Sequence, residues 1–311
     1  MVDLSDDERF LSVVVPVFGC KDSLEDLVSR ILRVASSNSY DTEILLIDDC
    51  SVDGSWEVIR RICLENRYVR GIRLSRNFGQ HIAIMAGFRA SRGRVVVVMD
   101  CDLQDPPELI PTLVRGTEHC PVSIARRTGP HQSLIRRVQA RFFHNVFAFS
   151  TGISLTRELT GFAALRRTVI DEYIKFTEPG QHFLHILSWL GFEEFVVTYH
   201  RPSRHSGKSS YTFKRRLRHA INGLLFETSR VLYIVAITGI FISFAGFVGA
   251  LIVLFRALTG ESLLGWPSTI SAIVIFGGSS ITIQSAVGVY VAKNFQQSKN
   301  RPLYVINELL N

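Results

Sequence analysis

The sequence offers its clearest chemistry at Asp100 and Asp102, two acids that directly follow the apolar run 95–99 (VVVVM). Carboxylates placed this close repel each other unless a cation lies between them. Oxygen ligands from Asp102, Gln104 and Asp100 would suit Mg²⁺ or Mn²⁺, with water and a nucleotide pyrophosphate filling the remaining positions. We therefore predict a divalent-metal site whose ion neutralises a leaving diphosphate. The alternative, a pair of solvated surface acids, is disfavoured by the apolar run before the pair and the two prolines after it.

A second acidic pair, Asp48 and Asp49, ends the apolar run 43–48 (EILLID). Acids at such a strand end accept hydrogen bonds from a ribose or a base N–H in dinucleotide folds, so both are candidate nucleotide contacts. The nearby Asp53 and Ser55 are explained equally well as a turn and a helix cap.

The segment 76–81 (RNFGQH) opens a predicted helix, and its backbone amides could meet a phosphate group. Asn77 and Gln80 are our candidates for this nucleotide contact. His81 is as well explained by hydrogen bonding at the helix start as by ligand contact.

Short apolar strands alternate with helices through the first hundred residues, which predicts a parallel sheet covered on both faces. Ligands bind such sheets at the carboxyl ends of the strands, where the polar residues named above gather. A capping box at Asp22 and Glu25 is expected to start the first helix. The expected strands are 11–17, 43–48, 69–74 and 95–100, and the later helices are 55–63 and 80–88.

Two long uncharged stretches, 231–255 and 262–292, lie near the C-terminal end. Each exceeds the roughly 20 residues that span hydrocarbon, so we predict transmembrane helices at about 231–255 and 266–292. Buried core helices are the alternative. Glycines in both stretches would allow the helices to pack closely or to meet partner chains, so a homo-oligomer is a candidate state.

Basic residues indicate the orientation in the bilayer. The segment 200–230 carries eight of them against one acid, and basic flanks stay cytoplasmic. We expect a cytosolic catalytic domain over 1–199, a basic juxtamembrane segment over 200–230, the two spans over 231–292 and a cytosolic tail over 293–311. Attraction to anionic lipid explains the formal net charge of +7 better than nucleic acid does.

The chain has five cysteines and no Cys-x-x-Cys pair, which suits a reducing compartment. We expect all five to be ordinary, partly buried thiols.

Five motifs together resemble the family-two glycosyltransferases that load sugars onto polyprenyl phosphates. That family includes dolichyl-phosphate mannose synthases, bactoprenol glucosyltransferases and undecaprenyl-phosphate aminoarabinose transferases. The last two groups are more similar, because this chain shares their two C-terminal spans and a tail like 301–304 (RPLY). The motifs are 14–18 (VVPVF), 48–55 (DDCSVDGS), 77–81 (NFGQH), 100–108 (DCDLQDPPE) and 207–211 (GKSSY).

This resemblance implies a GT-A (Rossmann-like) α/β fold, a metal held mainly by Asp102 and Gln104 with Asp100 nearby, and inverting single-displacement transfer. It also implies nucleotide contacts from Pro16, Val17 and either acid of the 48–49 pair. A UDP-sugar is the favoured donor, and a polyprenyl phosphate is the acceptor.

Basic residues supply candidate contacts to the phosphates. The pairs Arg126-Arg127 and Arg136-Arg137 match positions where the family holds phosphates, and Arg126 and Arg137 are the candidates for a catalytic role. Arg204 and Lys208 have the charge to bind a lipid phosphate at the membrane surface, although contact with lipid headgroups alone explains them equally well.

One departure from the family pattern lies at 158–162 (ELTGF), where many members carry an Asp-x-Gly-Asp-Phe-like stretch and this chain has Gly161 in place of the second acid. A phosphate monoester has a second pKa of about 6, so this nucleophile needs little deprotonation and a catalytic base is not essential.

The motifs also bear on two alternative functions. A processive polysaccharide synthase would carry a Gln-x-x-Arg-Trp motif, which 139–143 (QARFF) does not match, and a non-catalytic membrane scaffold would not keep an intact acidic cluster.

Overall fold

The computed structural model describes residues 10–128, 159–177, 182–200, 266–299 and 301–311, with single residues at 248, 255 and 259. These residues fall into two compact units. One contains the sheet and its helices together with the C-terminal segment 302–311, and the other contains the long helix α10 (Trp266–Ser298).

The predicted order of strands and helices in the first hundred residues is confirmed. Apolar residues fill these strands because both faces of the sheet are covered by helices. The strands are β1 (Phe10–Val17), β2 (Asp41–Asp48), β3 (Val69–Leu74) and β4 (Val95–Val98), and the helices are α1 (Leu24–Ser37), α2 (Ser55–Glu65) and α3 (Gln80–Ala90).

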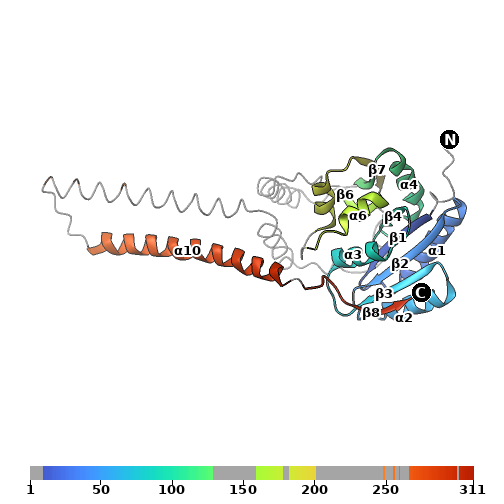
Figure 1. Cartoon of the computed structure of the whole chain (residues 1–311), viewed down its shortest axis with the longest axis horizontal. Coiled ribbons are helices and arrows are strands. Elements are labelled where there is room, and N and C mark those ends of the chain that lie inside the picture. Colours follow the sequence, from blue (N-terminus) through green and yellow to red (C-terminus); the bar gives the residue numbers. More distant parts are fainter. Residues whose placement is uncertain are drawn as a thin grey trace. The chain divides into compact units, whose positions relative to one another are not determined.

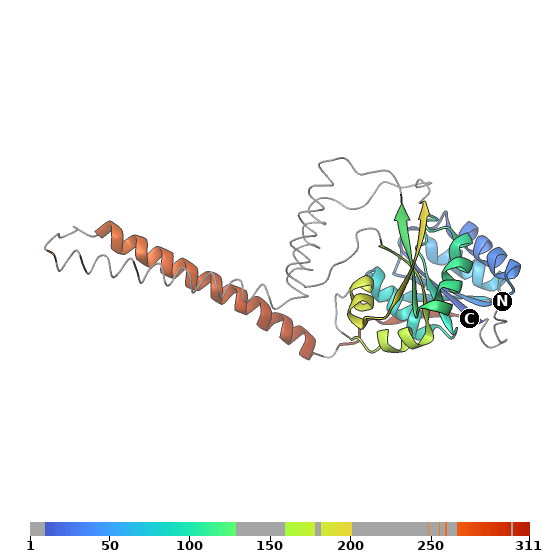
Figure 2. The ribbon, with the colours of Figure 1, turned by 90° about the horizontal axis from the view of Figure 1, so that it is seen from above.

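Within the described residues the sheet has eight strands in the order β7-β5-β6-β4-β1-β2-β3-β8, and Figure 1 labels all of them except β5. Strands β1 to β4 are parallel, whereas β6 runs antiparallel to β4 and to β5. Figure 2 shows β5 and β7 side by side, and they are parallel to each other. The added strands are β5 (Val122–Thr128), β6 (Leu159–Arg166), β7 (Glu194–His200) and β8 (Ile306–Leu310).

Alternate side chains of the strands enter two separate cores. Val13 and Val15 of β1 pack into the core that is covered by α1, α2 and α4 (Ile110–His119). Val14 enters the opposite core, which is covered by α3, α6 (Arg167–Tyr173) and α7 (Phe183–Leu190). This two-residue period is the geometry of a strand buried on both faces.

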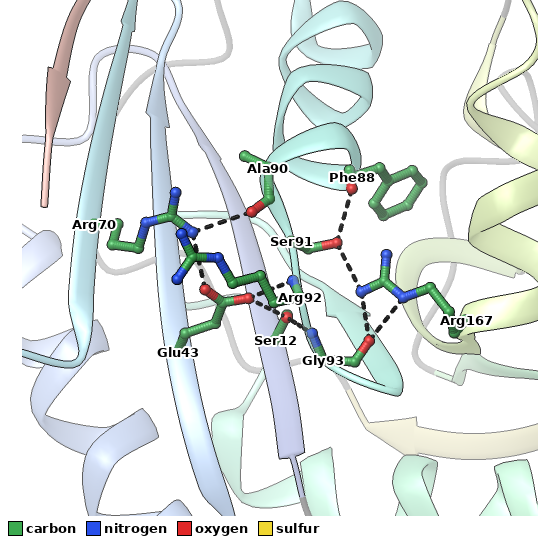
Figure 3. A network of polar contacts seen from close by, with 9 residues as sticks. All are labelled: Ser12, Glu43, Arg70, Phe88, Ala90, Ser91, Arg92, Gly93 and Arg167. Atoms are coloured by element: carbon green, nitrogen blue, oxygen red, sulfur yellow. Dashed lines mark hydrogen bonds and ion pairs between the residues drawn. The ribbon is translucent and has the colours of Figure 1, made fainter.

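A buried carboxylate organises the ends of the strands that lie away from the predicted site (Figure 3). Glu43 accepts hydrogen bonds from the Ser12 hydroxyl at 2.6 Å and the Arg92 backbone N–H at 2.6 Å, and it pairs with Arg70 at 3.0 Å. The Ser12 hydroxyl also accepts the Gly93 N–H at 2.7 Å. These bonds join β1, β2 and β3 to the loop that precedes β4.

One helix start differs from its prediction. Helix α1 begins at Leu24 with Ser23 at the N-cap position, and no side chain makes a capping hydrogen bond there. The proposed capping box of Asp22 and Glu25 is therefore wrong. The Glu25 carboxylate instead pairs with Arg61 of α2.

Helix α10 contains 33 residues and covers the second predicted span. In the described part of the chain, no helix combines the length and apolar character required for crossing a bilayer. The first predicted span, 231–255, lies outside the described residues except for Val248 and Phe255.

Candidate functional site

The candidate site lies at the carboxyl ends of β1, β2 and β4. These strands are parallel and adjacent, with β1 in the middle. Asp48 is the last residue of β2 and is the register partner of Val17, the last residue of β1. Asp100 follows β4 by two residues. The parallel register therefore places the two acidic segments at one edge of the sheet.

The acidic turn after β4 is held by its own hydrogen bonds. Asp105 Oδ2 accepts the Asp100 backbone N–H at 3.2 Å, and Asp102 Oδ1 accepts the Gln104 backbone N–H at 3.1 Å. Leu103 adopts a left-handed conformation with a φ of 60°, which turns the chain sharply between them. These contacts bring Asp100, Asp102 and Gln104 into one compact turn.

Asp105 was not predicted as a site residue, although it lies within the motif. Its carboxylate is almost fully buried, and its Oδ1 accepts the Tyr199 hydroxyl of β7 at 2.8 Å. Because the same carboxylate binds the Asp100 N–H, it fixes the start of the acidic turn against a distant strand. The only signal in the sequence was the position of this acid directly before two prolines, within the motif 100–108.

The donor atoms of the turn fit a divalent cation. Asp100, Asp102 and Gln104 are all half-buried and supply carboxylate and amide oxygens, which Mg²⁺ and Mn²⁺ prefer. Across the described residues, no group of three or more His, Cys, Asp or Glu side chains is arranged to hold a metal by itself. A metal here would take its remaining ligands from a diphosphate and water.

Asp49 holds the loop that follows β3. Its two carboxylate oxygens accept the backbone N–H groups of Phe78 at 2.7 Å and Gly79 at 2.8 Å. Burial raises the pKa of Asp49, and the two N–H donors oppose this rise. The carboxylate of Asp49 therefore shapes the loop that begins α3.

Asp48 has a different environment, although it is also buried. Its Oδ1 accepts the Ser51 N–H at 3.0 Å, and its Oδ2 lies 3.3 Å from Arg73 Nε. Burial raises the pKa of Asp48, while the contacts with Ser51 and Arg73 lower it.

Asp53 stabilises the turn before α2, as the alternative interpretation of Asp53 and Ser55 expects. Its Oδ1 accepts the backbone N–H of Ser55 at 3.1 Å and the Ser55 hydroxyl at 2.6 Å.

The other predicted nucleotide contacts are distributed around this edge. Gln80 is exposed at the start of α3, and its Nε2 donates to Asp100 Oδ1 at 2.7 Å, so the structure joins these two candidates. Asn77 is exposed on the loop before Gln80. Pro16 and Val17 are buried, and the Val17 carbonyl accepts the Asp49 N–H at 2.9 Å.

Cys101, between the two acids, forms a disulfide with Cys20 of the loop after β1. The structure shows this pair in its oxidised form, so the expectation that all five cysteines are ordinary thiols is wrong for Cys20 and Cys101 in this state. The strand order brings together two residues that are 81 positions apart. The Ser23 hydroxyl lies 2.6 Å from the Cys101 carbonyl and 3.0 Å from the Cys20 carbonyl. Cys50, Cys63 and Cys120 are free thiols.

Of the predicted phosphate-binding residues, the structure describes Arg126 and Arg127 on β5. Arg126 Nε is buried and has no hydrogen-bond partner among the described residues, whereas Arg127 is exposed. Gly161 lies on β6, and a Cβ atom added there would meet no atom of the described residues within 4 Å. Arg136, Arg137, Arg204 and Lys208 lie outside the described residues.

Solved structures define the class of this fold. One match is the crystal structure of glucosyl-3-phosphoglycerate synthase from Mycobacterium tuberculosis in complex with Mn²⁺, uridine-diphosphate-glucose and phosphoglyceric acid. The match covers 70% of this chain and 78% of that chain, with a TM-score of 0.51 and 16% sequence identity. The chain thus has the GT-A-like α/β fold of glycosyltransferases, as predicted.

The sequence comparisons give the family. The model described as glycosyl transferase family 2 matches residues 12–174, and the chain belongs to this family. It is 32% identical to the undecaprenyl-phosphate 4-deoxy-4-formamido-L-arabinose transferase of Shewanella sediminis, over 97% of this chain and 92% of that protein. It is 25% identical to the prophage bactoprenol glucosyl transferase homolog of Escherichia coli K12, over 96% and 99%. The resemblance predicted from the motifs is confirmed.

Proposed function

We propose that this chain transfers a sugar from a nucleotide sugar, with a UDP-sugar favoured, to a polyprenyl phosphate. One observation carries the proposal: the acidic turn of Asp100 and Asp102, held by the buried Asp105 at the end of β4, lies at the same sheet edge as Asp48. The names of the relatives support the acceptor, since one is an undecaprenyl-phosphate transferase and another a bactoprenol glucosyl transferase homolog. The similarity to the mycobacterial synthase concerns the fold alone, so the donor and the metal are part of our proposal.

The proposed residue roles follow from their chemistry. Asp102 and Gln104 would hold Mg²⁺ or Mn²⁺ with Asp100 beside them, and the metal would neutralise the charge that develops on the leaving diphosphate. Asp48 would fix the base or ribose end of the donor.

The acceptor phosphate would be held by arginine, which binds phosphate oxygens through two parallel N–H groups. Arg126 has a buried Nε without a hydrogen-bond partner among the described residues, which is consistent with this role. Arg136, Arg137, Arg204 and Lys208 remain further candidates. A dianionic phosphate attacks the anomeric carbon directly, so the sugar configuration inverts in one displacement and alignment replaces a catalytic base.

We also propose that the chain is anchored in the bilayer by spans at about 231–255 and 266–292, with its catalytic domain on the cytoplasmic side. The uncharged stretches and the basic segment 200–230 support this arrangement. Such an anchor places the transfer site at the height of a lipid phosphate.

The test is transfer of radiolabelled sugar by the purified full chain with Mg²⁺ or Mn²⁺. The donor panel consists of UDP-glucose, UDP-N-acetylglucosamine, UDP-galactose and GDP-mannose, with undecaprenyl phosphate as acceptor. Undecaprenol, which lacks the phosphate, is the matched acceptor control and should give no product. The anomeric configuration of the product, read by NMR, tests inversion. Absence of a lipid-linked product from every donor would exclude the proposed function.

A further inference from the structure

The C-terminal segment 302–311 is part of the sheet unit, although it follows α10 in sequence. Its strand β8 pairs antiparallel with β3, and Figure 1 shows it along that strand. Just before β8, the Val305 carbonyl accepts the Ser75 backbone N–H at 2.9 Å. Ser75 directly precedes the loop that Asp49 holds. The tail therefore completes the edge of the sheet beside the candidate site.

Three charged residues form a row across the last three strands: Asp48 on β2, Arg73 on β3 and Glu308 on β8. Arg73 is the register partner of Asp48 on one side and of Glu308 on the other. Its Nε lies 3.3 Å from Asp48 Oδ2, and its Nη1 lies 3.7 Å from Glu308 Oε1. Register partners project to the same face of a sheet, so the three side chains are neighbours.

Helix α2 fixes the outer end of this row. Glu308 Oε2 accepts the Trp56 indole N–H at 3.2 Å and pairs with Arg60 Nη2 at 2.8 Å. The Arg73 guanidinium carbon lies 5.6 Å from the centre of the Trp56 ring, within cation–π range. The guanidinium thus has a carboxylate on each side and an aromatic ring beside it. These contacts restrict a side chain that otherwise has much rotamer freedom.

Asp48 depends on this guanidinium because its side chain is fully buried. Asp48 Oδ2 accepts no hydrogen bond from the described residues, since Arg73 Nε approaches it as an ion pair without hydrogen-bond alignment. A buried carboxylate oxygen is costly unless a nearby cation compensates its charge. Arg73 is therefore the cation that faces this buried carboxylate oxygen at the end of β2.

We propose that Glu308 is a positioning residue for donor binding: it holds Arg73 against Asp48 and so fixes the strand end at which the nucleotide binds. The inference rests on the proposed function, because Asp48 is a donor contact only in an enzyme that uses a nucleotide sugar. It assigns the C-terminal strand a role in donor affinity that needs no contact between Glu308 and the nucleotide.

The test measures the affinity of the full chain for uridine diphosphate with Mn²⁺ by titration calorimetry, and repeats it with guanosine diphosphate. Glu308→Gln keeps the shape of the side chain but removes the charge that faces Arg73. We expect the Kd for the bound nucleotide to rise about five-fold, because coupling of this size is usual between contacting charged residues. The donor KM should rise in parallel, and the kcat should stay within about two-fold of wild type.

Arg60→Gln is the matched control, since it removes the other ion pair of Glu308 without touching Arg73 or Asp48. Glu308→Gln loses the ion pairs with both Arg60 and Arg73, and Arg60→Gln loses only the first. Partly exposed ion pairs contribute little to stability, so thermal melting of the two variants should be similar while only Glu308→Gln weakens nucleotide binding. Arg73→Lys keeps the charge but loses the planar fork, and it should raise the Kd as well.

The outcomes separate the two proposals. If the wild-type chain binds a nucleotide and Glu308→Gln binds it with the same Kd as Arg60→Gln, the positioning role is overturned. If the wild-type chain binds neither uridine diphosphate nor guanosine diphosphate, the proposed function is overturned and this inference with it.

Discussion

The Tyr199 hydroxyl donates a 2.8 Å hydrogen bond to Asp105 Oδ1, and so joins β7 to the acidic turn after β4 across 94 positions of sequence. Both side chains are buried. The other oxygen of Asp105 binds the backbone N–H of Asp100. The candidate metal ligands are thus supported by a strand that carries none of them.

Removing the Tyr199 hydroxyl tests this support. Tyr199→Phe leaves the ring in place but deprives a buried carboxylate of a donor, and hydrogen bonds to charged groups contribute about 1.5–3 kcal/mol. We expect a lower melting temperature and a reduced kcat. Tyr68→Phe is the control, because its hydroxyl binds only the exposed Arg67 side chain in the described contacts. Equal melting temperatures and rates for the two variants would contradict the supporting role of Tyr199.

Asp102→Asn should remove metal-dependent turnover while the protein stays folded. An amide oxygen carries no net charge and binds a divalent cation more weakly, so charge on the leaving diphosphate is less well neutralised. We expect kcat to fall on the order of 10²–10³-fold, the scale measured when a group that stabilises transition-state charge is lost. Chelation with EDTA should abolish wild-type turnover, and added Mn²⁺ should restore it.

The control for this prediction is Glu108→Gln, which removes an acid of the same segment. Glu108 is exposed and pairs with Arg30 at 2.6 Å on the surface. Its variant should keep more than about half of the wild-type rate, since surface ion pairs contribute little. Undiminished activity of Asp102→Asn would exclude Asp102 as a metal ligand.

The disulfide of Cys20 and Cys101 makes the proposed topology testable. Disulfides are rare in the cytosol, so a catalytic domain on that side should carry this pair as thiols in cells and close it when treated with diamide. Differential alkylation of acid-quenched cells, read by mass spectrometry, measures the fraction of each state. Cys63 is an internal control, because burial raises the pKa of its thiol to about 11 and keeps it unreactive.

A pair that is fully oxidised in growing cells would contradict the cytoplasmic placement of the domain. In the oxidised protein the bond closes a long loop, which stabilises the folded state by on the order of 4 kcal/mol in the chain-entropy account. Cys20→Ser should therefore lower the melting temperature of the oxidised protein and leave that of the reduced protein nearly unchanged.

The strands of the first hundred residues could be predicted from the sequence, because each of them is a short apolar run that ends at polar residues. The strand β3 was predicted with its observed bounds, Val69–Leu74. The edge strand β8 could not be predicted in this way, since its five residues are largely exposed and its partner β3 lies far away in sequence. Its pairing depends on tertiary structure, which no local pattern records.

The candidate site shows the same division. The acids at positions 48, 49, 100 and 102 were predicted because they follow strands. Their different roles were not, since Asp49 binds the backbone of Phe78 and Gly79 and Asp48 faces Arg73. Those roles depend on which neighbouring strand or loop each carboxylate meets. Sequence spacing therefore predicted which acids lie at this edge of the sheet, while the sheet register decides the contacts that each of them makes.

The buried Glu43 network provides a test of stability that is separate from the site (Figure 3). Glu43→Ala would leave Arg70, the Ser12 hydroxyl and the Arg92 N–H without their shared acceptor. Breaking a buried ion pair from one side costs about 3–5 kcal/mol. We expect a clearly lower melting temperature, with donor KM unchanged at temperatures where the variant is folded, because the network lies at the opposite ends of the strands.

Glu57→Ala is the matched control for Glu43→Ala, since Glu57 is an exposed acid on α2. Gly93→Ala is an independent test of how the loop before β4 packs against β1. A Cβ atom at Gly93 would lie 2.5 Å from the Ser12 backbone nitrogen, a contact that the β1 backbone cannot relieve without shifting. Gly93→Ala should therefore destabilise the fold as Glu43→Ala does. A melting temperature for Glu43→Ala equal to that of Glu57→Ala would show that the network contributes no net stability. Any lower melting temperature of Gly93→Ala would then report only the steric clash of the added Cβ atom.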